Sequence, residues 1–332
     1  MGPDRAGEIT DNQLALHAGW DEDMLQRELA ALQAAEFPLP LLGFEDTELT
    51  RLLAGADRQA FTADVDEIPA KPPLPISAPG DLWMLDEHRL LCGDATQRAT
   101  LDAVLAGAPA DMVFTDPPYN VAYTGKTARQ LQIHNDALGE QFYDFLHAAC
   151  VPLMAVCRGA IYICMSSSEL HTLYRAFTQA GGHWSTFLIW AKHHFTLGRS
   201  DYQRQYEAMA YGWPAGRQHY WCGARNQGDV WDIPRPLANR EHPTAKPVEL
   251  VERAVENSSR RGAIVLDPFA GSGSTLIACA RLRRQARLVE IDPQYVDVIC
   301  QRWQQYSGRP AVLAGDGRPF GQVASARRKC VA

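Results

Sequence analysis

The sequence has no long apolar run and no clustered cysteines. None of its apolar stretches approaches the roughly 20 residues that span a bilayer, and its start lacks the basic and apolar segments of a secretory signal. We therefore expect a cytoplasmic protein. The eight cysteines are scattered, without a C-x-x-C pair or a close Cys/His spacing. They are expected to be reduced, mostly buried thiols, and no metal is expected.

The chain also lacks an overall positive charge, since its net charge is −7 over 332 residues. The acidic residues are concentrated in residues 1–70, which carry four basic and fifteen acidic side chains, and the remainder is +4. Within that remainder, residues 190–247 hold eight Lys or Arg and five acids, interleaved with Trp and Tyr. A phosphate backbone responds to local charge, so this stretch is a candidate nucleic-acid contact. A solvated surface remains the alternative on charge alone.

A cluster of prolines separates two predicted regions of the chain. Residues 1–68 are predicted to form an acidic appendage of short amphipathic helices, with Asp21 as a plausible N-cap and too few apolar residues to bury a core alone. Residues 69–79 contain a cluster of prolines that cannot continue a helix, which predicts an extended linker. A second domain is expected over residues 80–323.

Strand-like and helical runs alternate from residue 80 onward, which is typical of an α/β fold with a mostly parallel sheet covered on both faces. No internal repeat interrupts the pattern. The predicted strands are 89–92, 111–115, 160–165, 186–190, 207–211, 263–266 and 286–291. The predicted helices are 141–155, 169–180, 247–258, 274–282 and 295–306.

A small-residue turn, Asp267-Pro-Phe-Ala-Gly-Ser-Gly-Ser-Thr275, follows one predicted strand and precedes a helix. Glycines let the backbone N–H groups approach a ligand there, and Glu290 at the end of the next strand can accept bonds from both ribose hydroxyls. The turn lacks the Gly-Lys-Ser/Thr ending of a phosphate loop. A nucleoside cofactor without phosphates is therefore expected, with a purely structural turn as the alternative.

A second turn, Asp116-Pro117-Pro118-Tyr119-Asn120, also follows a predicted apolar strand. The two prolines fix φ and hold the surrounding carbonyls rigid. The Asp116 carboxylate and the Pro117 carbonyl could accept both hydrogens of an exocyclic amine and favour a pyramidal nitrogen with an available lone pair. Tyr119 would offer a face on which a base that has left the duplex can stack. The alternative is an ordinary β-turn.

These motifs resemble those of the amino-group DNA methyltransferases. Phe269, Gly271, Gly273 and Thr275 match the F-x-G-x-G-x-T motif for S-adenosylmethionine, and 242–247 resembles the T-x-K-P element that closes over the methionine end of that cofactor. The turn at 116–120 resembles the D-P-P-Y-N of N6-adenine enzymes. The order of the motifs is that of the permuted β-group, which implies a Rossmann-like, circularly permuted methyltransferase fold with a mostly parallel seven-stranded sheet.

The resemblance implies site-specific transfer of a methyl group from S-adenosylmethionine to the N6 amine of a flipped-out adenine in double-stranded DNA, as in restriction-modification systems or phage orphan methylases. Homodimerisation is left open. The implied catalytic residues are Asp116, Pro117, Pro118 and Tyr119. The implied cofactor-binding residues are Asp94, Thr244, Lys246, Asp267, Phe269, Gly271, Gly273, Thr275 and Glu290. The DNA-recognition region would be about 193–240, and the variable region would also include 121–139, with candidate contacts at Lys126, Arg129, Arg199, Arg204 and Arg225.

Several alternatives stay open. Asp94, which would bond the cofactor's adenine, could instead be a helix N-cap. The activity could be N4-cytosine methylation, because the first residue of the catalytic turn does not separate the two classes cleanly. A non-catalytic DNA-binding relative is a further alternative. The segment 11–44 resembles the helical tail after a ParB/sulfiredoxin-like domain in phage-type methylases, which implies that this N-terminal domain is truncated here.

Overall fold

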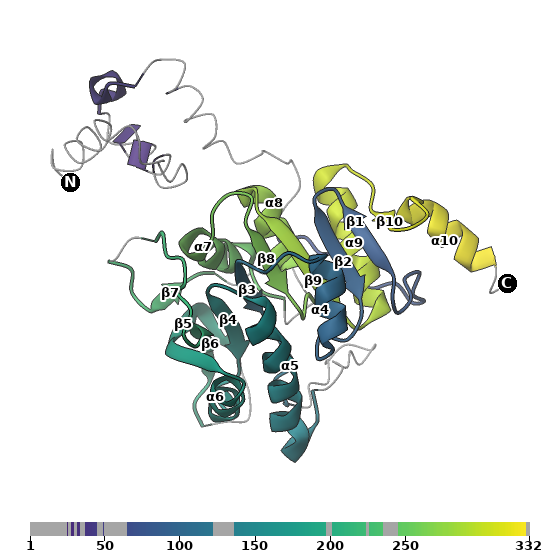
Figure 1. Cartoon of the computed structure of the whole chain (residues 1–332), viewed down its shortest axis with the longest axis horizontal. Coiled ribbons are helices and arrows are strands. Elements are labelled where there is room, and N and C mark those ends of the chain that lie inside the picture. Colours follow the sequence, from purple (N-terminus) through teal and green to yellow (C-terminus); the bar gives the residue numbers. More distant parts are fainter. Residues whose placement is uncertain are drawn as a thin grey trace. The chain divides into compact units, whose positions relative to one another are not determined.

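The chain divides into two compact units, residues 1–60 and 61–332, which are described separately. The computed structural model describes residues 65–121, 136–196, 201–223, 226–234 and 245–329, and some positions between 25 and 49 (Figure 1). Across these residues, no helix has the length and apolar character needed to cross a membrane.

The first unit contains a small apolar cluster around a short 3-10 helix, η1 (Leu39–Leu42). Its described members bury their side chains against one another, so leucines that appear isolated in the sequence share one core. The predicted N-cap Asp21 lies outside the described residues. The buried members are Leu25, Leu29, Leu39, Leu42, Phe44 and Leu49.

The described part of the second unit is built on a ten-stranded sheet in the order β10-β1-β2-β9-β8-β3-β4-β6-β5-β7. Seven of these strands overlap the predicted ones, and the others extend the sheet at its two edges. The strands are β1 (Leu82–Leu85), β2 (His88–Cys92), β3 (Met112–Thr115), β4 (Ile161–Met165), β5 (Gly182–Thr196), β6 (Arg204–Pro214), β7 (Val230–Asp232), β8 (Ile264–Asp267), β9 (Gln285–Glu290) and β10 (Val312–Leu313).

The middle of the sheet is parallel. β2, β9, β8, β3 and β4 pair in parallel with their neighbours. β6 runs antiparallel to both β4 and β5, which brings the start of β6 to the edge where the parallel strands end. Every residue of β3 and β4 is buried, as expected for parallel strands covered on both faces.

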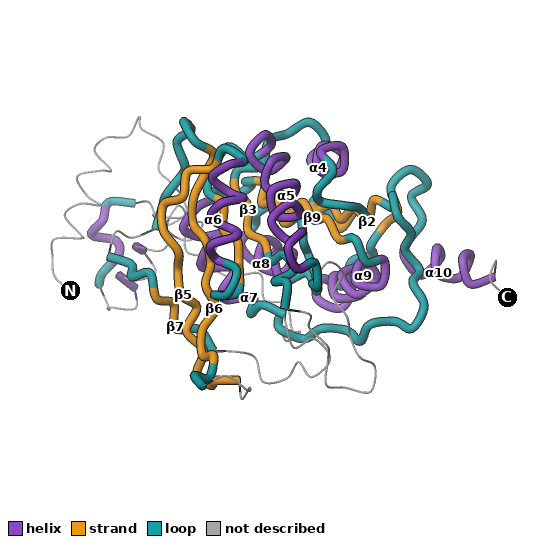
Figure 2. Tube along the Cα trace, turned by 90° about the horizontal axis from the view of Figure 1, so that it is seen from below, coloured by secondary structure: helices purple, strands orange, loops and turns teal. Residues whose placement is uncertain are grey.

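Helices cover both faces of the sheet (Figure 2). On β3, Val113 belongs to the core under α4, α5 and α6, while its neighbour Phe114 belongs to the core under α7, α8 and α9, because successive strand residues point to opposite faces. The described helices are α4 (Arg98–Leu105), η2 (Gly139–Gln141), α5 (Phe142–Val156), α6 (Leu170–Gln179), α7 (Val248–Ser258), α8 (Ser274–Leu282), α9 (Pro293–Ser307) and α10 (Phe320–Lys329).

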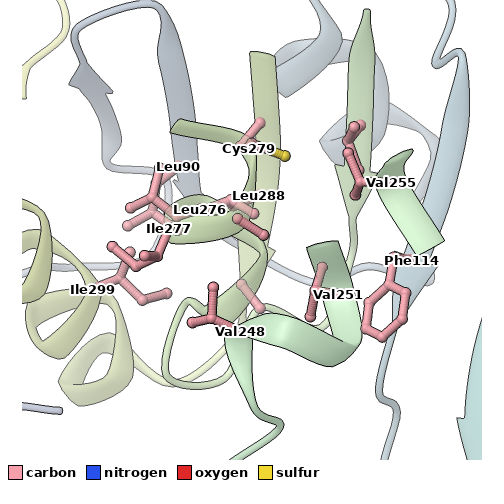
Figure 3. Close-up of a cluster of buried hydrophobic side chains, with 14 of the residues drawn as sticks. Leu90, Phe114, Val248, Val251, Val255, Leu276, Ile277, Cys279, Leu288 and Ile299 are labelled. Atoms are coloured by element: carbon pink, nitrogen blue, oxygen red, sulfur yellow. The ribbon is translucent and has the colours of Figure 1, made fainter. Parts of the chain in front are cut away.

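Helix α8 lies at the centre of the second core, between α7 and α9 (Figure 3). Its apolar side chains point toward the sheet and toward both neighbouring helices. This packing fixes the position of the turn that precedes α8. The buried residues drawn in Figure 3 include Leu276, Ile277 and Cys279 of α8, together with Leu90, Val251, Val255, Leu288 and Ile299 from the neighbouring strands and helices.

Candidate active site

The polar residues singled out in the sequence gather at one edge of the sheet. Asp116 follows β3, the glycine turn follows β8, and Glu290 ends β9. Because parallel strands point the same way, their carboxyl ends share an edge, which is where α/β sheets bind ligands. Glu207 near the start of β6 lies at the same edge, since its neighbour Ala208 pairs with Met165, the last residue of β4.

The turn after β3 is held by side chains from the following segment. The backbone N–H of Tyr119 donates to Asp136 Oδ1 at 2.9 Å. Asn120, with a left-handed φ of 56°, accepts from the N–H of Gly139 at 2.8 Å. The hydroxyl of Tyr119 lies against Asp116 Oδ1. The turn is therefore fixed at both ends, and the Asp116 carboxylate has a defined orientation.

A buried lysine faces the Asp116 carboxylate. The Nζ of Lys246, a side chain only 6% exposed, lies 2.6 Å from Asp116 Oδ2 and 3.1 Å from Glu207 Oε2. Lys192 forms a second ion pair with Glu207. The Lys246 ammonium also lies 5.2 Å from the centre of the Tyr119 ring. Two carboxylates and two ammonium groups thus neutralise one another beside the Asp116–Tyr119 turn.

Burial and the neighbouring charges together shift the pKa values of Asp116, Glu207 and Lys246. Burial raises the pKa of Asp116, and Lys246 offsets part of that rise. Burial would also raise the pKa of Glu207, but Lys246 and Lys192 outweigh it and lower that pKa to about 2. Burial alone would lower the pKa of Lys246, whereas Asp116 and Glu207 raise it above its ordinary value. Lys246 and Glu207 therefore stay charged at neutral pH.

The glycine turn is organised around Asp267. Its carboxylate accepts from the Thr115 hydroxyl at 2.8 Å, from the Thr275 hydroxyl at 2.6 Å and from the Phe269 N–H at 3.1 Å. Burial raises the pKa of Asp267 to about 6. Asp267 therefore ties the ends of β3 and β8 to the first turn of α8, and brings the two predicted turns together.

The two glycines of this turn have left-handed backbone, with φ of 53° at Gly271 and 84° at Gly273. A Cβ at Gly273 would lie 3.1 Å from Ile299, while one at Gly271 would meet no described atom within 4 Å. Backbone conformation favours glycine at both positions, and packing against Ile299 favours it further at Gly273. Among the described residues, the space beside Gly271 is therefore open.

Glu290 closes the other side of this turn. Its Oε2 accepts from the Gly271 N–H at 2.8 Å and its Oε1 accepts from the Asp292 N–H at 2.9 Å. Burial raises the pKa of Glu290 to about 7. Each carboxylate oxygen has a further acceptor position, so two hydroxyl donors can still be accommodated.

Comparison with known proteins assigns this arrangement to a family. Residues 110–301, more than half of the chain, match the family model described as DNA methylase. The chain belongs to the N6/N4 family of DNA methylases. Residues 23–79 match a second model, described as the ParB-methyltransferase HTH domain, in agreement with the resemblance predicted for the N-terminal tail.

Relatives of this DNA methylase include bacterial type II enzymes. Type II methyltransferase M.HpaI of Haemophilus parainfluenzae is 27% identical over 244 residues, which cover 65% of this chain and 74% of that protein. Type II methyltransferase M2.MboI of Moraxella bovis is 23% identical over 220 residues, covering 59% of this chain and 81% of that protein.

Solved structures show the same fold. The M1.HpyAVI-SAM complex has a TM-score of 0.50 and 22% identity, covering 64% of this chain and 98% of that chain. PvuII DNA methyltransferase, described as cytosine-N4-specific, has a TM-score of 0.52 and 15% identity, covering 79% of this chain and 96% of that chain. The Rossmann-like methyltransferase fold predicted for the DNA methylase is therefore confirmed.

Asp94 lies beside Glu290 in the DNA methylase. The N–H of Gly93 donates to the Glu290 carbonyl at 2.9 Å. The Asp94 carboxylate accepts from the N–H and hydroxyl of Thr96, at 2.9 and 2.8 Å. Helix α4 begins at Arg98, four residues after Asp94, with Gln97 as its N-cap residue. Asp94 thus follows the residue that bonds to Glu290, and it does not occupy the N-cap position of α4.

Several predicted residues of the DNA methylase lie outside the described part of the chain. They are Thr244 of the T-x-K-P element and the candidate DNA contacts Lys126, Arg129, Arg199 and Arg225. Arg204 is described, and its Nη1 donates to Ser166 Oγ at 3.0 Å, beyond the end of β4. Within the described residues, no group of three or more His, Cys, Asp or Glu is arranged to hold a metal.

Two residues of this site were not predicted as functional. The sequence pattern indicates Glu207 only as the start of a predicted strand and Lys192 only as part of a basic stretch. Each is a charged residue beside an apolar strand run, Glu207 before Ala-Met-Ala and Lys192 after Ile-Trp-Ala. A charged residue at the end of an apolar strand can indicate a functional site, because a charge that is buried there needs a partner.

Proposed function

We propose that this DNA methylase transfers a methyl group from S-adenosylmethionine to the exocyclic N6 amine of an adenine that has been rotated out of double-stranded DNA. The observation that carries the proposal is the placement of the Asp116–Tyr119 turn and the glycine turn at one edge, joined by the hydrogen bond from Thr115 to Asp267. A methyl donor and a methyl acceptor bound to these two turns would be neighbours.

The residues around Glu290 fit a nucleoside cofactor. Each oxygen of its buried carboxylate can accept one ribose hydroxyl. The open space at Gly271 leaves room for the cofactor beside the turn, and Asp94 lies next to Glu290 in a position to accept from an adenine amino group. When bound, S-adenosylmethionine supplies a methyl group on a sulfonium, which is a good leaving group.

The Asp116–Tyr119 turn fits the target amine. Asp116 is 26% exposed, so its carboxylate can be reached from outside, and the ring of Tyr119 is partly buried next to it. We infer that the Asp116 carboxylate and the Pro117 carbonyl accept the two amine hydrogens while the target base stacks on Tyr119. Pro118 keeps the turn rigid. Positioning and fixed charges carry the catalysis, since no covalent intermediate with the protein is needed.

Lys246 and Glu207 set the charge of this site. The amine becomes positively charged as it accepts a methyl group, and it then loses a proton. The Asp116 carboxylate stabilises that positive charge, and its raised pKa suits it to take up the proton. Lys246, held by Glu207, keeps Asp116 ionised before the reaction. The opposing effects of Lys246 and Glu207 thus set the pKa of the Asp116 carboxylate.

The hairpin of β5 and β6 supports a DNA contact. Beyond Lys192 and Glu207 it carries exposed aromatic side chains, with Phe195 at 55% and Tyr202 at 90% exposure. Phe195 lies three residues beyond Lys192, about 10 Å along an extended strand. A duplex that presents a base to Asp116 would meet this hairpin. Arg204, bonded to Ser166, is the described candidate for a phosphate or base contact.

Analysis of the modified nucleoside tests the proposal. DNA incubated with the protein and S-adenosylmethionine, then hydrolysed to nucleosides, should contain N6-methyladenosine in its deoxy form. Deoxycytidine methylated at N4 would show that the base assignment is wrong while the amino-methyltransferase assignment holds. Unmodified DNA, tested over a library of sequences, would contradict catalysis and favour a non-catalytic DNA-binding protein.

A further inference from the structure

The segment 65–77, which we call the strap, packs against α9. Its N-terminal part overlaps the predicted appendage and its remainder the predicted linker. Two buried residues of α9 hold the strap at its ends. The Asp297 carboxylate accepts from the N–H groups of Ile76 and Ser77 at 2.5 and 2.9 Å, and Arg302 Nη2 donates to the Val65 carbonyl at 2.7 Å. The strap is therefore anchored along its length.

The strap reaches α7 at the residue that follows the T-x-K-P element. The Asp66 Oδ1 accepts from the N–H of Val248, the first residue of α7, at 2.9 Å. The N-cap residue of α7 is Pro247, which makes no side-chain cap bond. Asp66 therefore provides the acceptor that a local N-cap would otherwise supply. Lys246, two residues earlier, faces Asp116, and its carbonyl accepts from Ser274 at 2.6 Å.

The strap also reaches the glycine turn and the turn after Glu290. Arg302 bonds the Val65 carbonyl through one amino group and donates to the Ser272 carbonyl through the other, at 2.9 Å. Lys71 forms an ion pair of 2.6 Å with Asp292, whose N–H donates to Glu290. Three loops that border the proposed cofactor site are thus tied to the strap.

We propose that the strap is a positioning element of the cofactor site, and that Asp66 sets the position of α7 and Lys246 relative to the glycine turn. The inference rests on the proposed function, because the site is the one assigned to S-adenosylmethionine. Asp66 does not touch the reacting atoms. Its loss should therefore weaken cofactor binding and raise the KM for the cofactor, with a smaller fall in kcat through the displacement of Lys246 beside Asp116.

Substitution of Asp66 in the full chain tests the proposal. Asp66→Ala removes the acceptor for the Val248 N–H and should weaken S-adenosylmethionine binding about fivefold, the effect of losing one helix cap. Asp66→Asn keeps a capping oxygen and should bind within about twofold of the unsubstituted protein. Glu67→Ala is the matched control, because Glu67 is an exposed carboxylate next in sequence. Calorimetry of cofactor binding and the steady-state KM and kcat are the readouts.

A second variant covers the case in which Asp66→Ala does not fold. Lys71→Met removes the ion pair to Asp292 at the opposite side of the site and should weaken cofactor binding about two- to threefold. Equal cofactor affinity in the folded variants and in Glu67→Ala would overturn the proposal. An equal loss in Asp66→Asn and Asp66→Ala would also overturn it, since a capping role requires rescue by Asn. Failure of the unsubstituted protein to bind S-adenosylmethionine would instead contradict the proposed function.

Discussion

The carboxylates in the two halves of the candidate site have different partners. In the cofactor half, Asp267 and Glu290 accept hydrogen bonds from backbone N–H groups and hydroxyls, and no Lys or Arg among the described residues forms an ion pair with either. In the target half, Asp116 and Glu207 contact Lys246, and Glu207 also contacts Lys192. In the cofactor half, burial raises the pKa of Asp267 to about 6 and that of Glu290 to about 7. In the target half, the lysines lower the pKa of Glu207 to about 2, while the pKa of Asp116 stays above its ordinary value.

This difference matches the charges of the proposed ligands. S-adenosylmethionine carries a sulfonium and would bring a positive charge of its own to the cofactor half. A nucleobase amine is neutral when it arrives, so the target half must contain its own cations to keep a carboxylate ionised. We infer that the carboxylates of the cofactor half are balanced by the positive charge of the bound ligand. Those of the target half are balanced by Lys246 and Lys192.

The largest expected effect comes from the target half. Asp116→Ala removes the carboxylate that faces the amine and should lower the methylation rate at least a hundredfold, about 3 kcal/mol in barrier height. Binding of S-adenosylmethionine should persist, because Asp116 does not contact Glu290. Single-turnover transfer and calorimetry measure the two separately. Asp102→Ala, an exposed carboxylate on α4, is the control. Activity of Asp116→Ala within threefold of the unsubstituted protein would remove Asp116 from the mechanism.

The next effect belongs to the cofactor half. Glu290→Ala removes the acceptor proposed for both ribose hydroxyls and should weaken cofactor binding at least about tenfold, in line with the loss of charged hydrogen bonds. Gly271→Val should give a comparable loss, because valine is strained at a φ of 53° and fills the space open to the ligand. Unchanged affinity in both variants, with the fold intact by circular dichroism, would place the cofactor elsewhere.

The pH dependence of cofactor binding tests the charge of the cofactor half. In the free protein the carboxyls of Glu290 and Asp267 have raised pKa values of about 7 and about 6, so they take up protons as the pH falls through that range. A sulfonium favours the ionised forms, and its affinity should therefore fall with decreasing pH, by at most about tenfold per unit for each proton. S-adenosylhomocysteine, which lacks the sulfonium charge, should show a weaker dependence. Equal slopes for the two ligands in calorimetric titrations would contradict the charge argument.

The smallest effect is expected from Glu207→Gln. Removing this negative charge lowers the pKa of Asp116, because Glu207 raises it and Lys246 then acts on Asp116 alone. The acidic limb of the kcat profile should shift to lower pH, while kcat changes less than in Asp116→Ala. Asp232→Asn, an exposed carboxylate on β7, is the control. A shift to higher pH would show that Glu207 does not act through Asp116.

Local patterns in the sequence were sufficient for the turns and the central strands. The glycine turn and the Asp116–Tyr119 turn each follow a short apolar strand, and the direction of parallel strands then brings them to one edge. The same reasoning placed Glu290. The edge strands β7 and β10, with three and two residues, are too short for any periodicity to be visible. Their pairing is decided by the neighbouring strands.

Contacts between distant segments could not be predicted in this way. Lys192 and Glu207 meet only because the register of β5 and β6 pairs Trp190 with Glu207. Asp66 and Val248 are separated by 182 residues and belong to no common motif. The prolines of the strap predict a segment without helix, but its attachment depends on buried side chains of α9, and the apolar periodicity of α9 predicts only that these residues belong to a helix. Such partners are fixed by tertiary packing.

A structure with S-adenosylhomocysteine bound is the most direct test of the central claim that one edge of the sheet holds the cofactor and the target amine side by side. The account predicts that the two ribose hydroxyls lie within hydrogen-bonding distance of the Glu290 carboxylate oxygens and that the sulfur faces the Asp116–Tyr119 turn. A nucleoside bound away from Glu290, or a sulfur that points away from Asp116, would contradict it.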